Sequence, residues 1–269
     1  MHENAWLYDL EIGGYSGDLD YWNALVEERG ARRVLDLACG TGRITLPIAT
    51  SLAKSGSDFH VLGLDNSPSM LETARARQLE MPESVRANID FILGDMVNFA
   101  LGEAFDVILI GFNSLMYIPQ QEDQISCLES VRRHLAPSGC FAFDILTPAL
   151  DYLLDAQRTP VVRLELERAA PEQGITQFLR FSTERYDAAT QLSHSDYFYE
   201  IYHADGRQQR FTDRLDWQMI FPREMELLGR VAGLKTISAF GDYDRTPFDR
   251  RSRQMLWIME LVEQANSAT

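Results

Sequence analysis

The stretch from 33 to 43, RVLDLACGTGR, decides the fold that this sequence predicts. Its first half, VLDL, is typical of a short buried parallel strand, and Gly40 and Gly42 follow at the spacing of a tight turn. Apolar residues then recur at helical spacing over 44–52. Glycine has no Cβ and adopts positive φ, so such a turn lets backbone N–H groups approach a ligand closely. The stretch therefore predicts a strand, a glycine turn and a helix that together bind a small molecule.

Two other kinds of glycine loop are excluded by the residues after Gly42. A dinucleotide-binding loop has a third glycine, in the pattern G-x-G-x-x-G, where this chain has Thr45. A P-loop continues with Gly-Lys-Ser or Gly-Lys-Thr, and this chain does not. From the residues alone, the remaining alternative is an ordinary strand-to-helix turn of an α/β protein.

The whole stretch resembles the first motif of the class I S-adenosylmethionine-dependent methyltransferases, in which an acidic residue precedes an Ala-Cys-Gly-Thr-Gly loop. The resemblance implies an α/β fold with a seven-stranded, doubly wound, mainly parallel sheet whose seventh strand is antiparallel. It also implies S-adenosylmethionine as the methyl donor and S-adenosylhomocysteine as the product. Within the stretch, it assigns cofactor contacts to Asp36, Ala38, Gly40 and Gly42.

The composition limits the kinds of binding partner and the cellular compartment that we expect for this protein. The chain has 269 residues and a formal net charge of −15, which argues against nucleic acid and weakly favours a cationic or neutral substrate. The N-terminus lacks a signal-peptide pattern, and no run of about 18 apolar residues occurs. We therefore expect a cytoplasmic protein that does not enter a membrane. The three cysteines, Cys39, Cys127 and Cys140, have no metal-type spacing.

The second predicted strand covers 60–65, HVLGLD, and ends in Asp65. An acid at the carboxyl end of the second strand of a doubly wound sheet is placed to accept hydrogen bonds from both hydroxyls of a ribose. Asp65 and the following Asn66 are therefore predicted to bind the cofactor. Ser67 and Pro68 predict the start of the next helix, as N-cap and first helical residue. The alternative for Asp65 is a capping role only.

The third and fourth predicted strands cover 89–93 and 105–110. In the family that the first motif resembles, a Gly-Asp-Met position after the third strand faces the adenine, which assigns Asp95 and Met96 to the cofactor. Phe112 follows the fourth strand, and we expect it beside the methyl group. The segment GFNSLMY there has no Pro-Pro pair, unlike methyltransferases of DNA bases and glutamine. It also offers no carboxylates for Mg²⁺, so no metal is expected.

Residues 1–30 are rich in aromatic and acidic side chains and predict an N-terminal helix that serves as a lid. In small-molecule methyltransferases with a similar opening, a Tyr-Asp pair and a later Tyr lie over the cofactor, which points to Tyr8 and Tyr21. A lid suits an alkylating sulfonium because it keeps water from the methyl group. The alternative is that rings of this segment pack on the core, as we expect for Trp22.

Beyond Leu146 the spacing of apolar residues changes from helical to alternating. Three segments share this alternation and are separated by turn residues: about 174–186, 192–203 and 210–220. They predict a small antiparallel β insert within 151–220. The cofactor-binding core is then divided into two parts, 31–150 and 221–269.

The place of this insert resembles that in N-methyltransferases of amino sugars and heterocyclic metabolites, where it covers the substrate and helps to form a dimer. The resemblance implies a homodimer that transfers a methyl group to nitrogen of a small amine or heterocycle, as in natural product biosynthesis. The insert offers three candidate bases, His194, Tyr186 and Tyr197. Two alternatives remain open: methylation of oxygen or carbon by the same fold, and cofactor binding without catalysis.

Overall fold

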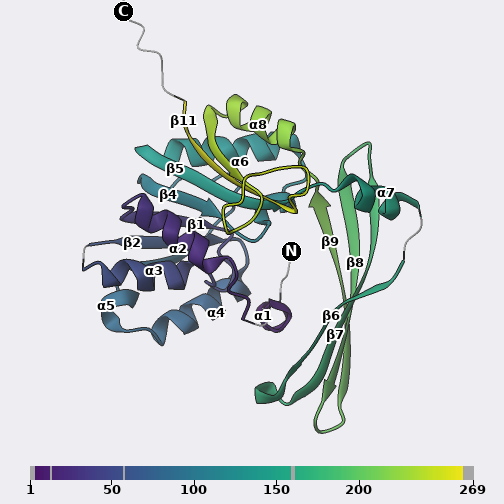
Figure 1. Ribbon diagram of the computed structural model, residues 1–269. Helices are drawn as coiled ribbons and strands as arrows, with labels where there is room; N and C mark the ends of the chain where they lie inside the picture. Colours follow the sequence, from purple (N-terminus) through teal and green to yellow (C-terminus); the bar gives the residue numbers. More distant parts are fainter. Residues whose placement is uncertain (1–3, 13, 57, 159–160, 263–269) are drawn as a thin grey trace, which may run out of the picture.

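The computed structural model describes residues 4–12, 14–56, 58–158 and 161–262. Residues 1–3 of the predicted N-terminal segment and 263–269 of the predicted core lie outside the described residues. Two sheets lie beside each other (Figure 1). One has seven strands in the order β10-β11-β5-β4-β1-β2-β3, and the other has four in the order β6-β7-β8-β9. The larger sheet carries the glycine turn, and the smaller one is the insert.

The larger sheet is parallel except at one strand. Its members are β1 (Arg33–Leu37), β2 (His60–Asp65), β3 (Ile89–Leu93), β4 (Phe105–Ile110), β5 (Leu135–Leu146), β10 (Leu234–Phe240) and β11 (Gln254–Leu261). β11 pairs antiparallel with both β5 and β10, while the pairs among β1 to β5 are parallel. The predicted seven-stranded, doubly wound sheet with an antiparallel seventh strand is thus confirmed.

Helices cover both faces of this sheet. They are α2 (Leu19–Glu28), α3 (Thr45–Lys54), α4 (Pro68–Leu79), α5 (Glu83–Arg86), α6 (Gln121–His134) and α8 (Pro222–Val231). Alternate residues of the central strands serve two cores, since Leu35 and Ile108 join the cluster under α6 and α8 whereas Val34 and Leu109 join the cluster under α2 and α3. Burial on both faces explains why these strands are continuous apolar runs.

The insert has four strands, not the three predicted. They are β6 (Arg163–Ala170), β7 (Ile175–Asp187), β8 (Leu192–His203) and β9 (Gln208–Gln218), preceded by α7 (Leu150–Arg158). The prediction missed β6 because its sequence, RLELERAA, consists of residues that favour helices. Pairing with β7 holds this edge segment extended. Most of its residues are exposed, which suits the charged composition of an edge strand.

The N-terminal segment forms two helices, whereas one was predicted. α1 (Ala5–Ile12) lies between the larger sheet and the insert (Figure 1). On the insert side, Leu7 and Leu10 join a buried cluster with Phe178 and Tyr199. The Glu11 carboxylate pairs there with Arg180.

The other side of α1 contacts the larger sheet's helices and glycine turn. The Asp9 carboxylate accepts hydrogen bonds from Thr41 Oγ1 at 3.0 Å and from Arg77 Nη2 at 2.6 Å. Helix α1 therefore connects the turn after β1 to the insert.

Candidate cofactor and acceptor site

The turn after β1 has the backbone that its glycines predict. Ala38, Gly40 and Gly42 have φ values of 56°, 55° and 78°, in the left-handed region that favours glycine. A Cβ added at Gly42 would lie 3.1 Å from the Phe91 ring, whereas one added at Gly40 would meet only the Tyr8 hydroxyl, at 4.0 Å. Gly42 thus serves close packing, and Gly40 leaves open space beside Tyr8.

Asp65 ties this turn to the start of α4. Its side chain is 6% exposed, and its two oxygens accept hydrogen bonds from Gly40 N at 2.7 Å and Ser67 N at 2.8 Å. Burial raises the pKa of Asp65, and the backbone hydrogen bonds oppose that rise. Ser67 also caps α4, because its side chain accepts from Met70 N, with Pro68 at the first helical position as predicted.

A small cavity of about 60 Å³ lies at the carboxyl ends of β1, β2 and β4. A smaller cavity of about 20 Å³ shares four of its lining residues, Tyr8, Ala38, Phe112 and Ser114. Of the predicted cofactor residues, seven line one or both of these cavities: Tyr8, Asp36, Ala38, Gly40, Asp65, Met96 and Phe112. The structure therefore gathers residues from five separate segments at one place.

Four predicted cofactor residues line neither cavity. Gly42 packs behind the turn, and Asn66 and Asp95 are exposed beside it. The Tyr21 ring is 3% exposed and packs edge-on against Trp22, with a centroid distance of 5.0 Å. Tyr21 thus lies in the core under α2 with Trp22, and not over the turn after β1.

Asp36 is a buried carboxylate at the floor of the smaller cavity. It is 2% exposed, and its Oδ2 accepts a hydrogen bond from Thr45 Oγ1 at 2.6 Å. Burial raises the pKa of Asp36 to about 7. Thr45, which replaces the third glycine of a dinucleotide loop, thereby satisfies this carboxylate.

Arg43 and Asp18 form a buried ion pair beside Tyr8 that the sequence did not reveal. Asp18 has no exposed surface, and its two oxygens accept from Arg43 Nη1 at 2.6 Å and Nη2 at 2.7 Å. The Arg43 guanidinium lies 4.8 Å from the Phe112 ring centre and hydrogen-bonds the Tyr8 hydroxyl. Burial raises the pKa of Tyr8 to about 12. The ion pair therefore holds the Arg43 guanidinium in contact with both Tyr8 and Phe112.

Asp144, near the end of β5, was also missed. Its carboxylate accepts from Phe112 N at 2.7 Å and Asn113 N at 3.1 Å. Phe112 and Asn113 have φ values of 56° and 63°, which are uncommon for residues other than glycine. Burial raises the pKa of Asp144 to about 7. A single acid in the apolar strand CFAFDIL was the available signal.

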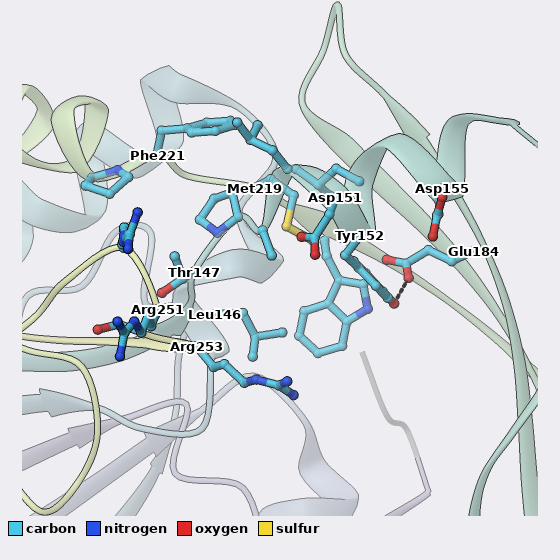
Figure 2. Close-up of a pocket in the computed structure, with 18 of the residues that line it drawn as sticks. Leu146, Thr147, Asp151, Tyr152, Asp155, Glu184, Met219, Phe221, Arg251 and Arg253 are labelled. Carbon is cyan, nitrogen blue, oxygen red and sulfur yellow. Dashed lines mark hydrogen bonds between the residues drawn. The ribbon is translucent and has the colours of Figure 1, made fainter.

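A much larger cavity, of about 1090 Å³, lies between the insert, the end of β5 and the segment that precedes β11 (Figure 2). Tyr197 and Trp217 line it from the insert, and Tyr152 lines it from α7. The Trp217 ring lies 4.7 Å from the ring of Tyr117, which lines the 60 Å³ cavity. This pair of rings forms a shared wall between the large and the small cavity.

The three candidate bases are placed differently. Tyr197 lines the large cavity and is 9% exposed. His194 lies on the opposite face of β8, where its Nδ1 is 2.7 Å from Asp216 Oδ1. Tyr186 is half-buried and packs against the larger core without lining the large cavity. The alternation of side chains along β8 separates His194 from Tyr197, because their positions differ by an odd number.

Two absences hold for the described part of the chain. Within it, no group of three or more His, Cys, Asp or Glu side chains could hold a metal ion. No helix of the described ranges is long and apolar enough to cross a membrane.

The core is similar to known methyltransferases. A family model described as a methyltransferase domain matches residues 34–139. The chain is 26% identical over 240 residues to the cypemycin N-terminal methyltransferase of a Streptomyces species, a match that covers 85% of this chain and 83% of that protein. Several other curated methyltransferases match only about half of the chain, and the demethylmenaquinone methyltransferase of Lactococcus lactis, 33% identical over 125 residues, is one.

Solved structures share the fold over almost the whole chain. The CcbJ methyltransferase from Streptomyces caelestis has a TM-score of 0.73 and 26% identity, covering 93% of this chain and 97% of that one. CalS10, an amino pentose methyltransferase from Micromonospora echinaspora with S-adenosylmethionine bound, has a TM-score of 0.67 and 21% identity, covering 96% and 97%. The likeness therefore includes the insert as well as the larger sheet.

Proposed function

We propose that this chain, as an S-adenosylmethionine-dependent methyltransferase, methylates a nitrogen of a small-molecule amine held in the cavity of about 1090 Å³. When bound, S-adenosylmethionine supplies a methyl group on a sulfonium that a nucleophile can attack in line. The residues of this chain have three tasks: to bind the donor, to exclude water, and to hold an amine at the shared wall and accept its proton.

The donor's place follows from the residues that line the two small cavities. Asp65 has a buried carboxylate at the end of β2, where it can accept from ribose hydroxyls, and Gly40 leaves space beside it. Tyr8 and Phe112 line both small cavities and are held by Arg43. These contacts support a donor site that α1 closes against water.

The carboxylates in the large cavity favour an amine over an alcohol as acceptor. Glu184 lines this cavity and accepts hydrogen bonds from Tyr152 and Ser193, with no cation beside it among the described residues. An ammonium group would complete this arrangement, and the Glu184 carboxylate could then take its proton. Burial raises the pKa of Tyr197, so its hydroxyl stays protonated at neutral pH and acts as a donor rather than a base. Glu184 is the observation that carries the proposal.

The first test asks which atom is methylated. The protein is incubated with isotopically labelled S-adenosylmethionine and matched amines, alcohols and phenols, and products are identified by mass. We expect label on the amines alone. Label on alcohols or carbon nucleophiles would overturn nitrogen transfer. The absence of a thermal shift with S-adenosylmethionine and S-adenosylhomocysteine would overturn donor binding.

The second test asks whether Glu184 accepts the proton. Glu184→Gln should lower kcat by about tenfold or more and move the acidic limb of the pH profile, because an amide cannot take the proton. Glu167→Gln, on the neighbouring strand β6, is the matched control, because the Glu167 carboxylate accepts a hydrogen bond from Gln177 and does not line the cavity. Equal loss in both variants would exclude Glu184 as the base.

We also propose a homodimer. α7 and β6 carry exposed large apolar residues: Leu150, Leu154, Val162 and Leu164 flank or belong to these elements. Exposed apolar groups that gather on one region are typical of interfaces. Light scattering after gel filtration should give twice the mass of one chain, 30.7 kDa.

A further inference from the structure

One wall of the large cavity carries three arginines in a short segment, Arg250, Arg251 and Arg253. Their side chains have no ion pair or hydrogen bond with any described residue. This is unusual here, because the chain has 40 acidic against 25 basic residues. Other arginines are paired, as Arg29 is with Glu260 and Arg245 with Glu28.

The segment is held in place by its backbone. Thr147 N donates to Arg253 O at 2.9 Å, which ties the segment to the end of β5. Asp249, the nearest acid in the sequence, accepts from Arg251 N through its Oδ1 at 2.7 Å. Asp249 therefore supports the turn, and no described carboxylate neutralises the three guanidinium groups.

The opposite wall of the cavity has the opposite charge. Figure 2 shows Arg251 and Arg253 on one side, and Asp151, Asp155 and Glu184 on the other. No ion pair joins the two walls among the described residues. A cavity of about 1090 Å³ keeps them apart, so a ligand can present a cation to one wall and an anion to the other.

We infer that the arginine segment 250–253 binds an oxyanion of the methyl acceptor, so that the acceptor is an amine with a carboxylate or phosphate at its other end. This inference rests on the proposed amine methylation. Guanidinium groups bind both oxyanions through paired N–H donors in a fixed plane. In a chain with a net charge of −15, an anionic acceptor needs such a local positive site to bind against the overall field.

The test compares three probes that differ only at one end: hexylamine, 6-aminohexanoate and 6-aminohexyl phosphate. Each is titrated calorimetrically into protein saturated with S-adenosylhomocysteine. We expect at least one anionic probe to bind about tenfold or more tightly than hexylamine, since hydrogen bonds to charged groups are worth about that factor. The tighter of the two anionic probes identifies the oxyanion. We also expect high salt to abolish the tighter binding of the anionic probes.

Variants show whether the arginines cause the difference. Arg251→Gln with Arg253→Gln should abolish the preference for the anionic probes. Arg207→Gln with Arg210→Gln removes the same charge at the exposed β8–β9 hairpin and should preserve the preference. Equal thermal midpoints would show that both double variants are folded.

Three results would overturn the inference: equal binding of hexylamine and the anionic probes, equal losses in the two double variants, or no binding of either anionic probe. Each is distinct from failure of the proposed function. If S-adenosylhomocysteine gives no thermal shift, or if no amine is methylated, the proposed function fails. If simple amines are methylated as well as anionic ones, only the arginine inference fails.

Discussion

The Oδ1 atom of Asp144 accepts a hydrogen bond from the backbone N–H of Phe112 at 2.7 Å, so the end of β5 holds the turn that follows β4. Phe112 lines both small cavities. Asp144→Asn replaces one acceptor oxygen by an N–H₂ group that faces backbone donors. We expect a loss of about 1–3 kcal/mol in the free energy of unfolding and weaker binding of S-adenosylhomocysteine, measured by denaturation and calorimetry.

A matched control lies at the other end of the sheet. The Asp106 carboxylate also accepts from two successive backbone N–H groups, those of Arg32 at 2.7 Å and Arg33 at 2.9 Å. Asp106→Asn should cost stability without changing the affinity for S-adenosylhomocysteine. Equal losses of affinity in the two variants would mean that Asp144 acts only through general stability.

Asp65→Ala should weaken binding of S-adenosylhomocysteine by about tenfold or more, because it removes an acceptor of charge-assisted hydrogen bonds from the ribose. Asp90→Ala removes an exposed acid that pairs with His60 at the opposite end of β2 and should leave the affinity unchanged. Calorimetric titration measures both. Unchanged affinity in Asp65→Ala would remove this residue from the donor site.

The raised pKa of Asp36 predicts how stability depends on pH. Burial raises it from 3.8 to about 7 in the folded chain, so the folded state binds more protons than the unfolded state between these values. The contribution of protonated Asp36 to the free energy of unfolding is therefore complete below about pH 4 and is lost as the pH rises through about 7. Asp36→Asn, which can still accept from Thr45 Oγ1, should flatten this part of the curve. Urea unfolding across that pH range would detect it, and an unaltered slope would contradict the prediction.

Trp217→Ala should raise the KM for the acceptor and leave the affinity for S-adenosylhomocysteine nearly unchanged, because the indole lines the large cavity. Phe198→Ala is the control, since Phe198 is 37% exposed on the other face of the insert. Steady-state kinetics and calorimetry separate the two effects. A larger change in donor affinity than in KM would show that the shared wall belongs to the donor site instead.

The strands of the larger sheet could be predicted closely because each is an apolar run that ends in a polar or glycine residue. The segments 60–65, 89–93 and 105–110 have the predicted bounds. A central parallel strand is buried on both faces, so its sequence is a nearly continuous apolar run that is easy to recognise. Strand β6 was missed because its pairing with β7, and not its own composition, makes it extended.

Side-chain orientation could not be predicted where distant segments decide it. Tyr21 and Tyr8 both lie in the aromatic and acidic N-terminal segment, yet the ring of Tyr21 is buried in the core under α2. The pairing of Arg43 with Asp18 depends on contacts between separate segments, which no local pattern reports. His194 and Tyr197 were both predicted as candidate bases, but residues three positions apart on one strand face opposite sides of a sheet, so only Tyr197 lines the cavity.

Helix α1 links the proposed donor site to the insert that covers the proposed acceptor cavity. Asp9 holds the glycine turn and Glu11 holds the insert, two residues apart on one short helix. A displacement of α1 that uncovers the donor site breaks its contacts with the insert as well. We therefore expect release of the spent donor and loosening of the acceptor's cover to occur together, because both require α1 to move.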